Sequence, residues 1–210
     1  MCSTHKIMES NKEIITDVDG DVYHTISIGT QMWTVENLRT TKYSDGTEIP
    51  LVVNTAEVWY ELNSPGYCWY NDNKHDKELT GALYNWHAVN TGKLCPKGWR
   101  IPTDEDWSIL AEYLGGDIVA GGKMKAIGTE SWADPNSGAT NSSGFTASYC
   151  SFRGKTGFIP SSNGTSLFWS STAYDDVNAW ARYLRFDSAA LGRNHGGKYH
   201  GFSVRCLRDK

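Results

Sequence analysis

Aromatic side chains have to supply much of the interior of this protein. Hydrophobic residues make up only 39% of the 210 positions, but 9 Trp and 11 Tyr compensate, because each buried ring removes a large area from water. The 21 Gly and a charged fraction of 21% favour a loop-rich, β-biased fold over one of long helices. The tryptophans that we expect in the core are Trp33, Trp86, Trp99, Trp107, Trp169 and Trp180.

The charge and hydropathy patterns exclude two functional classes. The formal net charge is −4, and no block of Lys and Arg offers the phosphate-neutralising surface that nucleic acid requires. No apolar run approaches the roughly 18 residues that a membrane-spanning helix needs. We therefore expect neither nucleic-acid binding nor a transmembrane helix.

The N-terminal segment is polar from Ser3 to Lys12 and follows a cysteine, Cys2. We predict that residues 1–12 form a disordered tether and that a single domain spans residues 13–210. A cysteine at a mature N-terminus before a polar tether is typical of a bacterial lipoprotein, which would place lipid on Cys2 and the protein on the cell envelope. A native cytoplasmic chain that begins this way is the alternative. Contact with a membrane is expected only through such a lipid anchor.

The remaining cysteines are Cys68, Cys95, Cys150 and Cys206, and no two of them have C-x-x-C spacing. This spacing pattern argues against zinc and thioredoxin-like chemistry, and the disulfide connectivity stays open at this point. We expect no metal ion and no cofactor.

The first strands are predicted at residues 14–18 and 22–28, because both runs are rich in β-branched residues. Asp19-Gly20-Asp21 between them indicates a hairpin turn. The acidic trio around this turn lacks the spacing of a calcium-binding EF-hand loop.

Two short helices are predicted. One covers residues 81–89, and the clearer one begins after Thr103, a good N-cap that acidic residues follow in the first turn. An apolar stripe on this second helix ends at Gly115-Gly116. Residues 134–166 are rich in Gly, Ser, Asn and Thr and indicate long ordered loops, whereas residues 202–206 are predicted as the final strand.

Several strings in this sequence resemble the Fibrobacter succinogenes major paralogous domain family and occur in the family's order. They are residues 19–25 (DGDVYHT), 29–33 (GTQMW), 36–38 (ENL), 66–71 (GYCWYN), 84–86 (YNW), 95–103 (CPKGWRIPT), 169–172 (WSST) and 201–206 (GFSVRC).

The central string and the closing Gly201-Phe202 are also similar to the formylglycine-generating-enzyme-like group, a branch of the C-type-lectin-like fold. The resemblance implies an α+β C-type-lectin-like fold with two short helices, a twisted, mostly antiparallel sheet and long ordered loops that display a binding face. It also implies a disulfide between Cys95 and Cys206, which match family positions better than Cys150 does.

Some members of this family resemble targets of diversity-generating retroelements, which rewrite Asn codons of a C-terminal repeat into codons that cannot encode Glu, Gln, Lys, Met or Trp. About one residue in five before Ala173 belongs to this set, whereas only Trp180 and Lys198 do so from Ala173 to Arg205. We therefore interpret the segment 174–200 as diversified, with chance composition as the alternative.

Within this segment we interpret Trp180, Arg182, Leu184 and Arg193 as framework, because a strand places successive side chains on opposite faces. The residues that we expect to vary and to bind ligand are Tyr174, Asp175, Asp176, Val177, Ala181, Tyr183, Arg185, Phe186, Asp187, Ser188, Ala190, Gly192, Asn194, His195, Gly196, Gly197, Tyr199 and His200.

Such a set resembles an antibody paratope, in which Tyr and Phe give rigid contact area and polar residues give adaptable contacts. The sequence thus predicts a non-catalytic, receptor-like or adhesin-like protein whose partner is a protein or a glycan on another cell or in the environment. We expect Tyr183 and Arg185 to be contact residues.

Three alternatives stay open. The first is a glycan-binding or structural envelope protein without diversification, although the tripeptides of calcium-dependent lectins are absent. The second is an oxidase similar to the formylglycine-generating enzymes, which use a close cysteine pair, whereas Cys206 has no near cysteine in the sequence. The third is a metal site formed by His195, His200 and Asp187, although histidines in a Gly-rich surface loop are more often solvated. No nucleophile elbow, phosphate loop or H-E-x-x-H motif indicates an enzyme.

Overall fold

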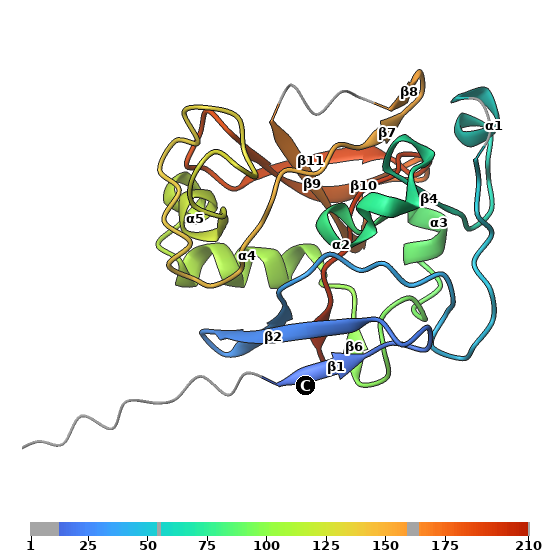
Figure 1. The fold of residues 1–210 in the computed structure, drawn as a ribbon, viewed down its shortest axis with the longest axis horizontal. Coiled ribbons are helices and arrows are strands. Elements are labelled where there is room, and N and C mark those ends of the chain that lie inside the picture. Colours follow the sequence, from blue (N-terminus) through green and yellow to red (C-terminus); the bar gives the residue numbers. More distant parts are fainter. Residues whose placement is uncertain (1–12, 54–55, 159–163, 210) are drawn as a thin grey trace, which may run out of the picture.

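The computed structural model describes residues 13–53, 56–158 and 164–209. The predicted tether and Cys2 lie outside the described residues. The described chain is α+β, with short helices and sheets whose paired strands are antiparallel (Figure 1). The helices are α1 (Ala56–Tyr60), α2 (Lys77–Thr80), α3 (Trp86–Val89), α4 (Asp104–Tyr113) and α5 (Asp117–Met124), with 3-10 turns at Tyr70–Asp72 and Lys74–Asp76.

A five-stranded sheet brings the two ends of the described chain together. Its spatial order is β1-β2-β3-β12-β6. The predicted hairpin forms β1 and β2, and the C-terminal β12 pairs with β3 on one side and β6 on the other. The structure also joins Cys95 to Cys206, across 111 residues of sequence, beside this sheet. The strands are β1 (Ile14–Thr16), β2 (Val22–Ile28), β3 (Gln31–Thr34), β6 (Trp99–Arg100) and β12 (Leu207–Arg208).

A second, three-stranded sheet contains most of the segment 174–200, and we call it the C-terminal sheet. Its order is β11-β10-β9. Its strands are β9 (Thr165–Ala173), β10 (Asn178–Arg185) and β11 (Gly192–Gly197); the small sheets are β4 (Tyr67–Trp69) with β5 (Ala82–Tyr84), and β7 (Arg153–Gly154) with β8 (Gly157–Phe158).

Helix α4 lies between the two larger sheets (Figure 1). Its predicted apolar stripe is buried and packs with Trp33 of the five-stranded sheet and with Phe168 and Leu184 of the C-terminal sheet. The predicted start is confirmed, because the Thr103 hydroxyl accepts the Asp106 N–H and the Asp106 carboxylate accepts the Thr103 N–H.

Two helix predictions were wrong in detail. The described chain has five α-helices rather than two. One of the additional helices, α5, begins directly after α4, since Leu114 is the C-cap of α4 and Gly116 is the N-cap of α5. The segment 81–89 is helical only from Trp86, since Ala82–Tyr84 pairs with β4 and the Asn85 side chain accepts the Ala88 N–H to begin α3.

The predicted final strand at residues 202–206 was also wrong. Gly201, Phe202 and Ser203 form isolated bridges to Arg153, Tyr84 and Phe168, which belong to three different strands. A segment that pairs with several partners in turn does not form a regular ladder, and the final strand is β12.

The aromatic core agrees with the sequence except at one position. Trp180 is only half-buried. Its ring is covered by the Arg193 guanidinium of β11, 3.5 Å from the ring centroid, and it does not belong to a buried hydrophobic cluster. The expected tryptophans that are buried are Trp33, Trp86, Trp99, Trp107 and Trp169.

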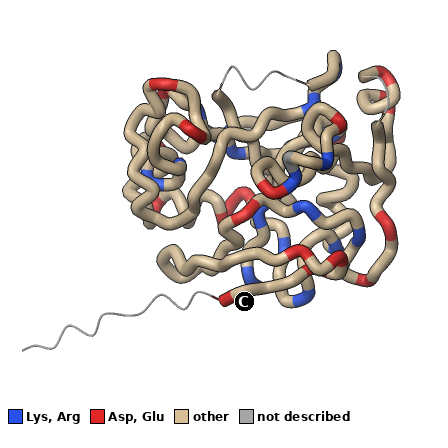
Figure 2. Tube along the Cα trace, viewed as in Figure 1, with Lys and Arg blue, Asp and Glu red and all other residues tan. Residues whose placement is uncertain are grey.

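Charged residues of both signs are interspersed along the chain (Figure 2). Buried arginines connect distant segments: Arg205 donates to the Asn37 side chain and to the carbonyls of Thr34, Val35 and Phe145. Burial lowers the pKa of Arg205 to about 9. Among the described helices, none has the length and apolarity needed to cross a bilayer.

Candidate binding site

The expected contact residues occupy the C-terminal sheet and its connecting turns, and most of them reach the surface. Ala181, Gly196 and Gly197 lack the surface exposure that we expected of them. Ala181 packs in the aromatic core, while the two glycines lie beneath the rings of Phe202 and Tyr199. The members that are exposed are Tyr174, Asp175, Asp176, Val177, Arg185, Asp187, Asn194 and His195, and those that are half-buried are Tyr183, Phe186, Ser188, Ala190, Gly192, Tyr199 and His200.

The exposed residues do not share one continuous sheet face, because packing covers much of both faces of β10. Leu184 belongs to the cluster under α4, and Ala181 belongs to the cluster on the other side. Tyr183 is half-buried and its ring lies over Gly192. The expected residues therefore gather at the two ends of the sheet.

A groove of about 660 Å³ opens at the end where β10 begins and β11 ends. We call this the groove end. Of the expected residues, it is lined by Asp176, Val177, His195, Gly196, Gly197, Tyr199 and His200. The groove is also lined by residues that the sequence did not indicate: Tyr60 of α1, Leu62 and Asn63 of the chain after it, and His87 of α3. No sequence signal links these positions to residue 199, because only the fold brings them together.

Ring contacts make one wall of the groove rigid. The Tyr199 ring meets Tyr60 edge-on at 4.7 Å and stacks on His200 at 4.3 Å, and His200 stacks on Phe202 at 5.3 Å between ring centroids. A Cβ on Gly197 would lie 2.4 Å from the Tyr199 ring, so only glycine allows this close approach. The wall thus presents aromatic edges and faces that lose little entropy on binding.

Charges in the groove are mostly satisfied internally. The Lys198 ammonium donates to the Asp176 carbonyl at 2.8 Å and lies over the Trp86 ring. Burial, together with the charge of Lys198, lowers the pKa of His87. Burial also lowers the pKa of His200, and this effect outweighs the hydrogen bond to the Gly197 carbonyl. Both imidazoles are therefore neutral at pH 7, and the groove is polar rather than strongly charged.

Next to the groove, an exposed aromatic cluster forms around His195. The Tyr174 ring stacks on His195 at 4.2 Å and meets Trp180 edge-on at 4.8 Å. Arg193 covers Trp180 and pairs with Asp104 at the start of α4 at 2.7 Å. Trp180 and Arg193, interpreted from the sequence as framework, thus contribute to the surface.

The turn before β10 is held by a single carboxylate. Asp175 accepts the backbone N–H groups of Val177 at 2.8 Å and Asn178 at 2.7 Å, as well as the Asn178 side-chain amide. These bonds lower the pKa of Asp175. They fix Val177 in an exposed position at the edge of the groove.

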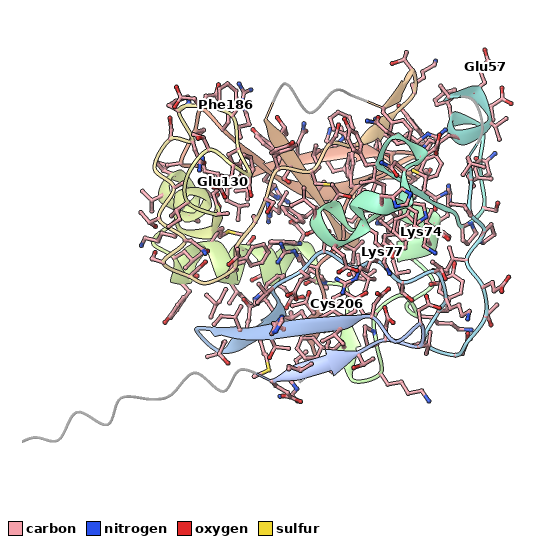
Figure 3. The ribbon with its side chains drawn as sticks, in the orientation of Figure 1. Glu57, Lys74, Lys77, Glu130, Phe186 and Cys206 are labelled. Carbon is pink, nitrogen blue, oxygen red and sulfur yellow. A yellow bond between two sulfur atoms is a disulfide. The ribbon has the colours of Figure 1, made fainter. Side chains whose placement is uncertain are left out.

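The opposite end of the sheet, which we call the α5 end, is closed by packing. The buried Lys125 ammonium donates to the carbonyls of Ser137, Arg185 and Ser188, each at 2.9 Å. The exposed Arg185 guanidinium pairs with Asp187 at 2.7 Å. Figure 3 shows Phe186 of this turn on the opposite side of the molecule from Glu57 of α1.

The described cysteines outside the disulfide are not exposed. Cys68 and Cys150 are free but buried, and burial raises the pKa of their thiols to about 12 and about 11. Thiolates are therefore strongly disfavoured there. Among the described residues, no group of three or more His, Cys, Asp and Glu side chains is arranged to hold a metal ion.

Together these features define an α+β protein with an aromatic-walled surface groove at one end of its C-terminal sheet. The chain belongs to the Fibrobacter succinogenes major domain family, whose sequence pattern matches residues 26–208. The predicted family membership is thus confirmed. Comparisons with curated proteins and with solved structures give no match.

Proposed function

We propose that this protein is a non-catalytic, receptor-like or adhesin-like ligand-binding protein, and that the groove end is its binding site. The observation behind the proposal is the convergence of residues 176–177 and 195–200 on one groove, which Tyr60, Leu62, Asn63 and His87 also line. Pockets with apolar walls and a few polar groups are the usual sites of ligand binding.

The proposal includes a C-type-lectin-like scaffold. Three observations support it: both ends of the described chain contribute strands to the five-stranded sheet, the longest described helix packs between two sheets, and long segments without regular structure connect the elements. In such a scaffold the core can stay constant while the loops and strand ends change.

The proposal also includes diversification of the segment 174–200. The low content of Glu, Gln, Lys, Met and Trp in this segment supports it, as does the burial of the framework residues Arg182 and Leu184. Deep sequencing of the gene in a growing population should show adenine-dependent changes at the expected contact codons and none at the codons before 173. Uniform variation along the gene, or none, would contradict diversification.

Binding without catalysis is favoured over the oxidase alternative by the state of the cysteines. Cys206 is in a disulfide, and Cys68 and Cys150, the free cysteines among the described residues, are buried and have raised pKa values. We propose a protein or a glycan as partner and the cell envelope as location.

Binding can be tested with two defined probe sets, a glycan array and a random 12-residue peptide library displayed on phage. We expect at least one probe to bind the full chain and Tyr199→Ala to weaken that binding at least about tenfold, as expected for a central aromatic contact. Tyr113→Ala is the matched control, because Tyr113 is 65% exposed on α4 and does not line the groove. Absence of any binder, or equal loss in both variants, would contradict the proposed function.

A further inference from the structure

Strand β11 has an open edge. Within the part of the chain that the structure describes, β10 pairs with β11 on one side and no strand pairs with it on the other. The register between β10 and β11 is regular over its whole length, from the pair of Tyr183 with Gly192 to the pair of Asn178 with Gly197.

The hydrogen bond beyond the end of β11 shows which main-chain groups point to this open edge. Lys198 donates its N–H to the Val177 carbonyl at 2.9 Å, in the same register as the β10–β11 pairs. Hydrogen-bonded pairs alternate along an antiparallel ladder. Asn194 therefore directs its N–H and C=O toward β10, whereas Arg193 and His195 direct theirs away from the sheet.

The two residues that carry these outward groups, Arg193 and His195, are exposed. The His195 N–H is bonded only locally, to the Asn194 side-chain oxygen at 2.9 Å. An incoming carbonyl can replace that bond without disturbing the ladder with β10.

The edge also lacks the usual protection against pairing. Exposed edge strands are normally blocked by charged side chains, Pro or a β-bulge, but β11 reads GRNHGG and contains neither Pro nor a bulge. Its one charged side chain, Arg193, is held over the Trp180 ring and paired with Asp104. The last three residues of β11, His195, Gly196 and Gly197, line the groove, so the open edge leads directly into it.

We propose that the edge of β11 binds an extended peptide segment of a partner protein as an additional strand, with an apolar or aromatic side chain of that segment in the groove. This inference rests on the proposed function and specifies its ligand class. A peptide fits both features of this surface. The outward N–H and C=O groups of β11 can form hydrogen bonds with the main chain of a peptide, and the aromatic wall with Tyr60 and Tyr199 can contact an apolar side chain. A glycan would use the groove without needing the strand edge.

The test uses the full chain and the strongest peptide selected from the 12-residue phage library, resynthesised as a set in which one amide at a time is N-methylated. N-methylation should weaken binding at least about tenfold at alternate positions of the paired stretch and have little effect at the positions between them. This two-residue period is the signature of strand pairing.

On the protein side, His195→Pro removes an outward N–H that the ladder does not use, and edge positions of this kind tolerate proline. We expect at least about tenfold weaker peptide binding with an unchanged melting temperature. His195→Ala is the control, because it removes the same ring and its stacking with Tyr174 but keeps the N–H. If His195→Pro does not fold, the N-methylated peptides still decide the question.

Other outcomes separate this inference from the proposed function. Peptides that require Tyr199 but show no alternation on N-methylation would overturn strand addition and leave the groove as binding site. Binding of array glycans without peptides would do the same. A dimer of this chain that His195→Pro dissociates would assign the edge to a second copy. Absence of any binder in either probe set would reject both proposals.

Discussion

The two ends of the C-terminal sheet contain similar residue types but differ in how their side chains are held. At the α5 end, the buried Lys125 ammonium donates hydrogen bonds to two carbonyls of the turn after β10, those of Arg185 and Ser188. The turn also packs against α5. At the groove end, Tyr199 and His195 contact mainly other surface rings. Exposure alone therefore does not define a binding site, because a ligand also needs space between the side chains.

This difference changes the expectation for Tyr183 and Arg185. Tyr183 covers Gly192, and Arg185 pairs with Asp187 at the α5 end, away from the groove. We therefore expect substitutions at the α5 end to change stability and substitutions at the groove end to change binding. The following predictions test that division.

The largest effect is expected for Lys125→Met. The substitution leaves three carbonyls, those of Ser137, Arg185 and Ser188, without their buried donor. Each unsatisfied group has a cost, and we expect a loss of about 3–5 kcal/mol in the free energy of unfolding. Urea unfolding measures it. Lys97→Met, at an exposed position, is the control and should change stability by less than about 0.5 kcal/mol. A similar small change for both variants would show that the α5 end is not held by Lys125.

A smaller loss is expected for Gly121→Ala in α5. Its Cβ would lie 2.2 Å from the Ala190 carbonyl oxygen, so helix and turn must separate. We expect a cost of about 1–3 kcal/mol, as for other overpacked sites, with unchanged binding at the groove. Thermal unfolding of both variants measures the cost, and Ile118→Ala is the control because Ile118, in the same helix, is 82% exposed. Weaker ligand binding in Gly121→Ala alone would contradict the independence of the two ends.

A modest pH effect is expected at the groove end. Burial lowers the pKa of His200 in the folded state, so the unfolded chain binds a proton first as the pH falls. Stability should thus be constant above the ordinary histidine pKa of about 6.5 and decrease as the pH falls below it. His87, whose pKa burial also lowers, adds to the same slope.

The measurement is the free energy of unfolding between pH 7.5 and pH 5, on the order of five points, for wild type and His200→Asn. The variant should show a shallower decline, whereas His75→Asn, which changes an exposed histidine outside the groove, should follow the wild type. Identical slopes for all three proteins would show that His200 is not protected from protonation by the fold.

The smallest effect is expected for Arg185→Ala. Its ion pair with Asp187 is solvent-exposed on both sides, and pairs of this kind contribute about 0–1 kcal/mol. We expect binding at the groove to stay within about twofold of wild type, well below a hot-spot effect. Loss of binding comparable to that in Tyr199→Ala would extend the binding site to the α5 end.

Local chemistry made several elements predictable. The turn Asp19-Gly20-Asp21 produced the β1–β2 hairpin, and Thr103 with its acidic successors produced the start of α4. Both depend on hydrogen bonds within a few residues, which the sequence contains in full. The prediction failed where the outcome depended on distant partners, as at residues 82–84, which pair with β4, and at residues 201–203, which bridge three strands.

The same division applies to the site. The family, the aromatic core and the segment whose residue types suit contact surfaces could be recognised from the residues alone. The separation of this segment into two ends, the contribution of Tyr60 and His87 to the groove, and the position of Trp180 under Arg193 became visible only in the folded chain. Side-chain type and strand alternation are local properties, whereas a groove is the space left between segments that are far apart in the chain.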